Sequence, residues 1–232
     1  MKIKTIKTRI FKEGEDLIAF ILHYLKSIPD GSILVVTSKI VALAEGRTAD
    51  PAIKEGLIKS ESDFSIRTKY VWLTLKDGMA MANAGIDESN ARGKLILLPR
   101  DSYQTAFRLR NKLLKEFALK KLGVLITDSR TMPLRAGVTG VALGYAGFRG
   151  LRDYRGRPDI FGRKLKFSRT DVADSLATAA VLVMGEADEQ YPLAVITHAG
   201  VEFCKKVAKD ELRIDPLEDM YRPLFESLPK IE

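Results

Sequence analysis

Apolar residues recur at helical spacing in three parts of the chain. The first is 14–28, GEDLIAFILHYLKSI, with acids in its first turn and a lysine near its end. The second is 102–123, where Ala106, Leu109, Leu113 and Phe117 form one stripe. The third is 170–186, with Thr170 as the expected N-cap. This spacing predicts three helices, and Gly123 and Gly185 are expected to end the second and third.

Short, continuous apolar runs predict the strands between these helices. ILVVTS (33–38) reads as a buried strand, and KIVALAEGR (39–47) as a short helix that stops at Gly46. Residues 70–86 favour a hairpin with Lys76, Asp77 and Gly78 as its turn. The polar stretch 48–70 is expected to be a loop with little regular structure.

The second half of the chain predicts further strands. VLITD (124–128) follows the second long helix directly, and PLAVIT (192–197) is the last strand. The stretch 137–150 alternates glycine with small apolar residues, which is typical of a strand in a crowded place. A short helix is expected around 217–227.

The fold class is therefore α+β, or mixed α/β, with a mixed, partly antiparallel sheet. Neither an internal repeat nor a linker divides the chain, so residues 1–232 are interpreted as a single unit.

Composition narrows the chemistry. The chain is 46% hydrophobic and 29% charged, the composition of a globular protein. Its N-terminus lacks the apolar core of a signal peptide, and its longest apolar run (17–25) is too short to span a bilayer, so a cytoplasmic protein without membrane partners is expected. One cysteine and two histidines leave neither a disulfide nor a Cys/His zinc site. Any metal would need oxygen ligands, as Mg²⁺ or Mn²⁺ prefers.

The net charge of +8 favours anionic partners. Three interpretations explain this charge: binding of nucleic acid, binding of a nucleotide together with an anionic substrate, or a basic face that is merely solvated. The arginine-rich stretch 148–167, interleaved with Phe148, Tyr154 and Phe161, leaves the same alternatives open: an RNA-binding face, a site for a phosphorylated small molecule, or a solvated loop. His198 and Cys204 are interpreted as structural.

Three carboxylates stand where an element ends. Asp87 follows the hairpin, Asp128 ends the strand ITD, and Glu186 follows the third helix. Rigid elements hold metal ligands well, and Ser129 could add a neutral oxygen. Carboxylates at element ends also cap helices or meet water, so the residues alone leave both interpretations open.

Ordered blocks of this sequence resemble the coenzyme F420-0:L-glutamate (gamma-glutamyl) ligase family. The blocks are VVTSKIVALAEGR, NAGIDESN, GVLITDS with PLRAGVTGVALGYAG, the long run from LRDYRG to VLVMGE, and EDMYRPLF. They occur in order over most of the chain and are densest between Gly123 and Glu186.

The resemblance implies an intertwined, two-lobed homodimer that uses GTP to join the amine of L-glutamate to a carboxylate on a deazaflavin precursor. The acceptor would pass through an acyl phosphate, with two Mg²⁺ or Mn²⁺ ions neutralising the phosphates. Some members also require a monovalent cation such as K⁺.

The resemblance also implies site residues. Asp87 and Asp128 match the ligands of one metal, and Ser129 and Glu186 those of the second. The nucleotide positions are Ser38, Lys39, Asn90 and the stretch Met184, Gly185, Glu186, Ala187, Asp188, Glu189, Gln190 and Tyr191, with a weaker N-terminal segment near Thr8–Phe11. No catalytic side chain is assigned.

Two departures concern the substrate. The family usually places a lysine where this chain has Leu43, and the region between Arg47 and Asn83 is shorter than usual, lacking a helical portion. The alternatives to a deazaflavin acceptor are therefore a folate-like carboxylate, or a non-catalytic protein that binds nucleotide or RNA.

Overall fold

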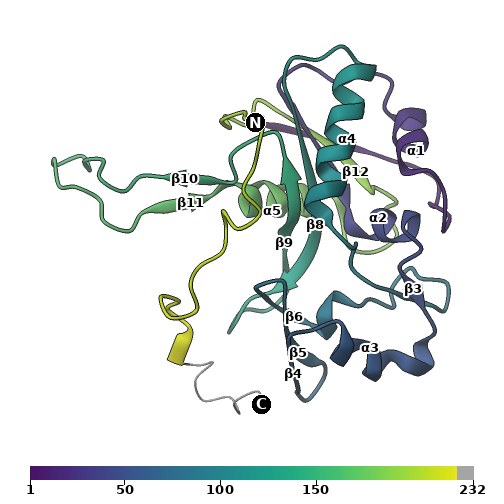
Figure 1. Cartoon of the computed structure of the whole chain (residues 1–232). Helices are drawn as coiled ribbons and strands as arrows, with labels where there is room; N and C mark the ends of the chain where they lie inside the picture. The colour runs from purple at the N-terminus through teal and green to yellow at the C-terminus, as the bar shows by residue number, and fades with distance from the viewer. Residues whose placement is uncertain (224–232) are drawn as a thin grey trace.

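The computed structural model describes residues 1–223. Its centre is a five-stranded sheet in the order β1-β12-β2-β8-β9 (Figure 1). β2 and β8 run parallel, and the other neighbouring pairs are antiparallel. The expected mixed, partly antiparallel sheet is confirmed.

The strands of this sheet are β1 (Lys2–Ile6), β2 (Ser32–Thr37), β8 (Leu122–Thr131), β9 (Val138–Ala146) and β12 (Leu193–Thr197). The helices are α1 (Leu17–Tyr24), α2 (Ser38–Ala44), α3 (Lys54–Ser60), α4 (Ser102–Glu116) and α5 (Val172–Met184).

Two hydrophobic layers form because successive strand residues point to opposite faces. Leu34 and Val124 pack with α1, α2 and α4 on one face. Val35 and Leu125 pack with α5 on the other. Strands covered on both faces need apolar residues at every position, which explains the unbroken runs in β2 and β8.

Glycines in β9 let two helices approach its backbone. A Cβ atom at Gly140 would lie 2.4 Å from the carbonyl oxygen of Ala177 in α5, and one at Gly144 would lie 2.5 Å from the backbone of Ser102 at the start of α4. The expected strand in a crowded place is confirmed, with packing as the reason for its glycines.

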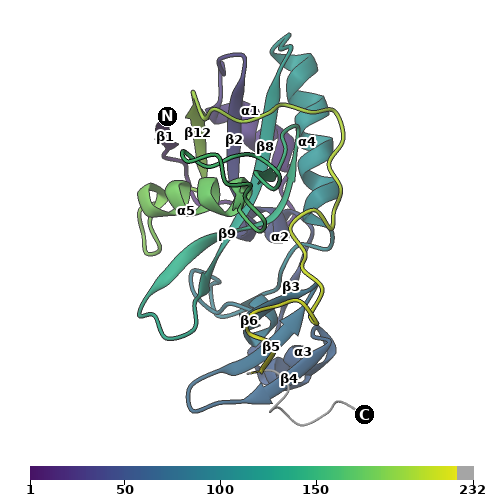
Figure 2. The same ribbon diagram turned by 90° about the vertical axis from the view of Figure 1, so that its left-hand side faces the viewer.

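A smaller lobe lies at one end of the sheet (Figure 2). It contains α3, the antiparallel sheet β4-β5-β6 and the short pair β3-β7. The bounds are β3 (Thr48–Ala49), β4 (Phe64–Arg67), β5 (Trp72–Lys76), β6 (Met79–Ala82) and β7 (Leu95–Ile96), with 3₁₀ turns at Pro51–Ile53 and Asn83–Gly85. The expected hairpin is confirmed, and its turn residues Asp77 and Gly78 both have positive φ.

The stretch 48–70 is not a loop, and the region between Arg47 and Asn83 does contain a helix. It forms β3, a 3₁₀ turn, α3 and β4. The reason is tertiary: Ile58 is buried with Ile86, Leu95 and Leu97, so the helix gains most of its stability from packing against residues far along the chain.

Two expected helix boundaries were also wrong. α4 ends at Glu116, and Gly123 lies inside β8, where a Cβ would press on Ile33 and Phe148 at 2.9 Å. The N-cap of α5 is Asp171, whose carboxylate accepts from the backbone N–H of Asp174, and Thr170 lies in the short strand β11 (Arg169–Asp171). Gly185 ends α5 as expected.

An arm projects from the body between β10 (Leu151–Asp153) and β11 (Arg169–Asp171), which pair antiparallel (Figure 1). It carries the arginine-rich stretch. Ile160, Phe161 and Phe167 are each at least 87% exposed there, whereas Phe148 is wholly buried in the core. Phe148 is therefore not available to stack on a base.

The chain beyond β12 runs along the body towards the smaller lobe (Figure 2). The Tyr145 hydroxyl donates to Glu211 of this tail at 2.7 Å, and the Gly150 N–H donates to the same oxygen at 3.0 Å. The helix expected around 217–227 falls partly outside the described residues, and the described part, 217–223, is mostly turn. Within residues 1–223, no helix has the length and apolar character needed to cross a membrane.

Candidate functional site

The candidate site begins where β2 and β8 end side by side. Thr37 pairs with Thr127 in this parallel pair, so the next residues, Ser38 and Asp128, emerge at the same edge of the sheet. The carboxyl ends of parallel strands are the usual place for ligands in α/β sheets. Ser38 is buried as the first residue of α2, and Lys39 follows it.

Lys39 reaches the acidic loop after the hairpin. Its Nζ atom lies 2.8 Å from Oδ2 of Asp87 and donates to the hydroxyl of Ser89 at 2.6 Å. Burial opposes ionisation of Asp87, but the bonds from Lys39 and Ser89 outweigh it and hold the pKa of Asp87 below its usual value. A predicted nucleotide residue and a predicted metal ligand are thus paired.

The pKa of Asp128 is shifted in the opposite direction from that of Asp87. Burial raises the pKa of its carboxyl to about 6, against a bond from the backbone N–H of Ser129, and the negative charges of Asp87 and Glu186 raise it further. These charges act only because the fold brings the three element-end carboxylates near one another. A cation placed between them would relieve this repulsion.

Ser129 and Glu186 are in direct contact. The Ser129 hydroxyl donates to Oε2 of Glu186 at 3.3 Å, which joins β8 to the end of α5. Gly185, with φ of 83°, ends the helix and lets the chain turn so that Glu186 follows at once.

The predicted nucleotide segments also meet here. Asn90 donates from Nδ2 to the carbonyl of Ala187 at 3.0 Å, and the backbone N–H of Thr8 donates to the carbonyl of Gln190 at 3.0 Å. The loop after α5 therefore contacts both the hairpin loop and the N-terminal segment. Met184 differs from the rest, since its side chain is buried in the core beneath α5.

The donor set suits a hard divalent cation in kind, since Asp87, Asp128, Ser129 and Glu186 offer only oxygen atoms. Across residues 1–223, no three His, Cys, Asp or Glu side chains gather in an arrangement ready for a metal ion. Mg²⁺ commonly uses one or two carboxylates together with substrate phosphates and waters. Two ions, each with two protein ligands, would therefore suit these residues better than one ion held by protein ligands alone.

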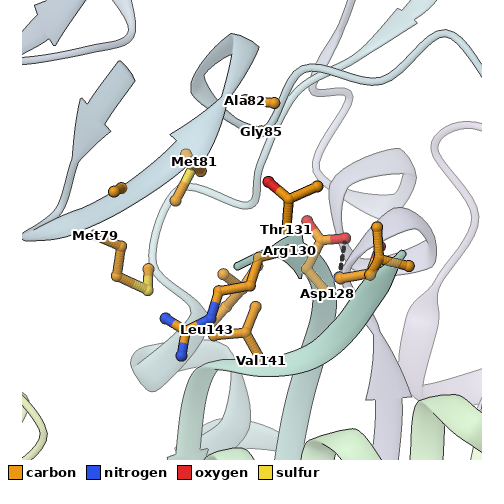
Figure 3. A pocket seen from close by; sticks show the side chains of 12 residues that line it. Met79, Met81, Ala82, Gly85, Asp128, Arg130, Thr131, Val141 and Leu143 are labelled. Atoms are coloured by element: carbon orange, nitrogen blue, oxygen red, sulfur yellow. Dashed lines mark hydrogen bonds between the residues drawn. The ribbon is translucent and has the colours of Figure 1, made fainter. Parts of the chain in front are cut away.

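A cavity of about 120 Å³ opens beside Asp128, between the smaller lobe and the main sheet. β6 contributes Met79 and Met81, and β9 contributes Val138, Val141 and Leu143 (Figure 3). Asp128, Ser129, Arg130 and Thr131 of β8 form its polar side.

Arg130 and Asp174 are candidate site residues that the sequence patterns did not single out: Arg130 lines the cavity and Asp174 contacts it. Nη2 of Arg130 donates to Oδ2 of Asp174 at 2.9 Å, and Oδ1 of Asp174 accepts from the backbone N–H of Ala142 at 2.9 Å. Strand alternation from Asp128 could have indicated Arg130, because residues i and i+2 share a face. Asp174 lies in the first turn of α5, where an acid also interacts favourably with the helix dipole.

Comparison with known proteins decides the family. The model of the F420-0:Gamma-glutamyl ligase family matches residues 5–55 and 50–198. The chain belongs to this family. A coenzyme F420:L-glutamate ligase of Methanocaldococcus jannaschii is 31% identical over 234 residues, covering 92% of this chain and 93% of that protein. The protein of the same name from Methanopyrus kandleri is 36% identical, with 81% of this chain and 82% of that protein covered. The one from Archaeoglobus fulgidus is 31% identical, with 92% of each chain covered.

Leu43, where the family resemblance leads us to expect a lysine, is a packing residue in this structure. Leu43 packs against both the core beneath α2 and the small cluster of Ala42, Ala91 and Ile96. Its side chain is partly buried and packs between the main sheet and the loop that carries Asn90.

Proposed function

We propose that this chain is a GTP-dependent ligase that joins L-glutamate to a small carboxylated acceptor, with an F420-0-like deazaflavin precursor as the first candidate. The observation that carries the proposal is the meeting of the predicted site segments at one edge of the sheet: β2 and β8 end side by side there, Lys39 pairs with Asp87, and Ser129, next to Asp128, donates to Glu186. Full-length relatives named coenzyme F420:L-glutamate ligase support the acceptor.

The chemistry follows from the weakness of a carboxylate as an electrophile. The acceptor carboxylate takes the γ-phosphoryl group of GTP, which forms an acyl phosphate and releases GDP. The glutamate amine, having lost its proton, then attacks the acyl carbon, so that the C–N bond forms and the C–O bond to phosphate breaks. Phosphoryl transfer of this kind depends on positioning and charge neutralisation more than on covalent help from the protein.

In this proposal the acidic residues hold the ions and Lys39 faces the nucleotide. Asp87 and Asp128 would hold one Mg²⁺ or Mn²⁺, and Ser129 and Glu186 the other. When bound, the ions would neutralise the phosphate oxygens during transfer. Lys39 could then pair with either of two anions, Asp87 or a phosphate of the nucleotide. Asn90 and the loop 184–191 would surround the nucleotide. A K⁺ requirement, as in some family members, is an additional proposal.

The test is acceptor-dependent phosphate release, with the product identified by mass. The purified chain is incubated with GTP, Mg²⁺ or Mn²⁺, L-glutamate and a panel containing the deazaflavin precursor and folate-like carboxylates. Asp128→Asn should reduce turnover at least about 100-fold, because a neutral amide is a much weaker ligand for Mg²⁺. The matched control is Asp63→Asn, the same change at an exposed carboxylate just before β4. Wild-type turnover in Asp128→Asn would overturn the metal assignment.

Two alternatives are separated by the same panel. Turnover with only a folate-like acid would keep the chemistry and change the acceptor. Nucleotide or RNA binding without phosphate release would favour the non-catalytic interpretation, and RNA binding should then weaken steeply with salt. The buried position of Phe148 weighs against the RNA interpretation of the arm.

We also propose that the chain is a homodimer joined through its arm. Ile160, Phe161 and Phe167 expose large apolar surfaces in the arm between β10 and β11, where a second copy would cover them. Light scattering should give twice the chain mass of 25.8 kDa, and Phe161→Ser with Phe167→Ser should shift it towards the monomer. A monomeric wild type at micromolar concentration would contradict this.

A further inference from the structure

The cavity beside Asp128 has properties that the proposed metal and nucleotide roles do not use. It is far smaller than the 300–1,000 Å³ typical of pockets for drug-sized ligands, at about 120 Å³. A space of this size suits one amino acid better than a ring system or a nucleotide. Its apolar wall of methionine, valine and leucine side chains suits methylene groups.

The two ends of the cavity differ in charge. Figure 3 shows the guanidinium of Arg130 on the side towards Met79, well separated from the carboxylate of Asp128. Val141 and Leu143 lie along the same wall. A ligand that fits this arrangement has a cationic end, a short apolar middle and an anionic end.

Arg130 retains hydrogen-bond donors for such a ligand. A guanidinium has five N–H donors, and the recorded bond to Asp174 uses Nη2. Within residues 1–223, Nε of Arg130 is the buried side-chain polar atom that finds no hydrogen-bond partner. Asp174 is itself fixed by the N–H of Ala142 and by its place in α5, so it holds the guanidinium in position without satisfying it.

The position of Asp128 fits the other end. The Asp128 carboxylate lines this end of the cavity, and Glu186 accepts a bond from the neighbouring Ser129, so carboxylates gather here and attract a cation such as an ammonium group. An amine held there would lie at the edge of the sheet where the acyl group would form. The anionic end of the same molecule would then reach Arg130.

We propose that this cavity binds the amino-acid substrate, with the amine of L-glutamate towards Asp128, its methylenes against Met79, Val141 and Leu143, and its side-chain carboxylate on Arg130. This rests on the proposed ligase function. It assigns Arg130 as the residue that selects an acidic amino acid, and Asp174 as the residue that positions it.

The first test is direct binding of L-glutamate by calorimetry in the presence of Mg²⁺ and a non-hydrolysable GTP analogue. Wild-type protein should bind L-glutamate and bind L-norvaline, which lacks the side-chain carboxylate, at least about tenfold more weakly. Arg130→Met should weaken glutamate binding about 10- to 100-fold, as expected for the loss of a charged hydrogen bond, and remove the preference over norvaline. The matched control is Arg108→Met, at an exposed position of α4.

A second variant controls for misfolding, because Arg130→Met also removes one of the two hydrogen-bond donors that hold Asp174. Met81→Trp fills the cavity and leaves the Arg130–Asp174 pair intact. It should weaken glutamate binding by a similar factor while binding of the GTP analogue stays within about threefold of wild type. Thermal unfolding of each variant shows whether the fold is kept.

Turnover separates this inference from the proposed function. The KM for glutamate should rise in Arg130→Met, with the KM values for acceptor and GTP nearly unchanged. A raised KM for the acceptor alone would place the acceptor carboxylate here and overturn the inference. Unchanged glutamate binding in folded Arg130→Met and Met81→Trp, or no binding by wild type, would also overturn it. Glutamate binding that obeys these expectations without any ligation would leave the cavity assigned and the proposed reaction wrong.

Discussion

Lys39 and Asp87 form an ion pair in which Nζ lies 2.8 Å from Oδ2. One residue belongs to the segment expected to contact nucleotide, and the other to the set expected to hold metal. The pair therefore links the two ligands, since a cation that approaches Asp87 must compete with Lys39, and a phosphate that attracts Lys39 frees Asp87.

This competition predicts opposite effects of Lys39→Met on the two ligands. Without nucleotide, Mn²⁺ should bind more tightly, by a few-fold, because Asp87 no longer pairs with a lysine. Nucleotide should bind more weakly, about tenfold or more, because a charged contact is lost. Calorimetry measures both, with Lys54→Met, which breaks the similar surface pair with Glu88, as the control. Tighter nucleotide binding in Lys39→Met would contradict the assignment.

The raised pKa of Asp128 predicts how stability depends on pH. The folded state holds this proton up to about pH 6, above the ordinary value of 3.8, so the contribution of Asp128 to stability falls as pH rises from about 4 to 6. Asp128→Asn should remove this loss and stabilise the metal-free protein at pH 7 by up to about 3 kcal/mol. Urea unfolding at pH 4 and pH 7 in EDTA measures the difference.

Part of the pH dependence should remain in Asp128→Asn. Burial and the nearby charge of Asp174 also raise the pKa of Asp171 to about 6, and the bond from the N–H of Asp174 does not outweigh them. Saturating Mn²⁺ should reverse the ranking at pH 7, because the metal stabilises only the protein that binds it well. A variant that is less stable than wild type at pH 7 in EDTA would show that burial and the neighbouring charges do not destabilise the ionised Asp128.

The close packing around the glycines of β9 predicts that replacing either Gly140 or Gly144 by alanine will strongly lower the free energy of unfolding. Gly140→Ala would place its Cβ 2.4 Å from the Ala177 carbonyl oxygen, and Gly144→Ala would press on Ser102 at 2.5 Å. Both contacts involve backbone, so each variant should lose about 3 kcal/mol of unfolding free energy or fail to fold. Gly56→Ala is the control, since its Cβ meets nothing within 4 Å in α3 and should add up to about 1 kcal/mol. Thermal unfolding distinguishes these outcomes.

The contact between Tyr145 and Glu211 predicts how the tail is held. Tyr145→Phe removes one bond to Glu211 and leaves the bond from the N–H of Gly150, so the cost should be about 1 kcal/mol. Limited proteolysis after residue 200 should become faster in this variant. Equal cleavage rates in the two proteins would show that this bond does not control release of the tail.

The sequence by itself determined the elements whose stability is local or whose burial is complete. Continuous apolar runs are enough to specify β2 and β12, because a strand buried on both faces tolerates little else. The turn at Asp77–Gly78 and the end of α5 at Gly185 follow from backbone conformations that few residues adopt. The ordered motifs also carried the family resemblance and hence the list of candidate residues.

Only the tertiary structure decided how those residues meet. α3 could not be predicted from its polar sequence, because it depends on burying Ile58 against β7. From the sequence, Gly123 is predicted to end a helix. In the structure it lies in the sheet, where the side chains of Ile33 and Phe148 occupy the space that a Cβ atom would need. The pairing of Lys39 with Asp87, and the position of Arg130 between Asp174 and a cavity, join segments 48 and 44 residues apart. Sequence periodicity reports which face a side chain occupies, and it does not report which distant element that face will contact.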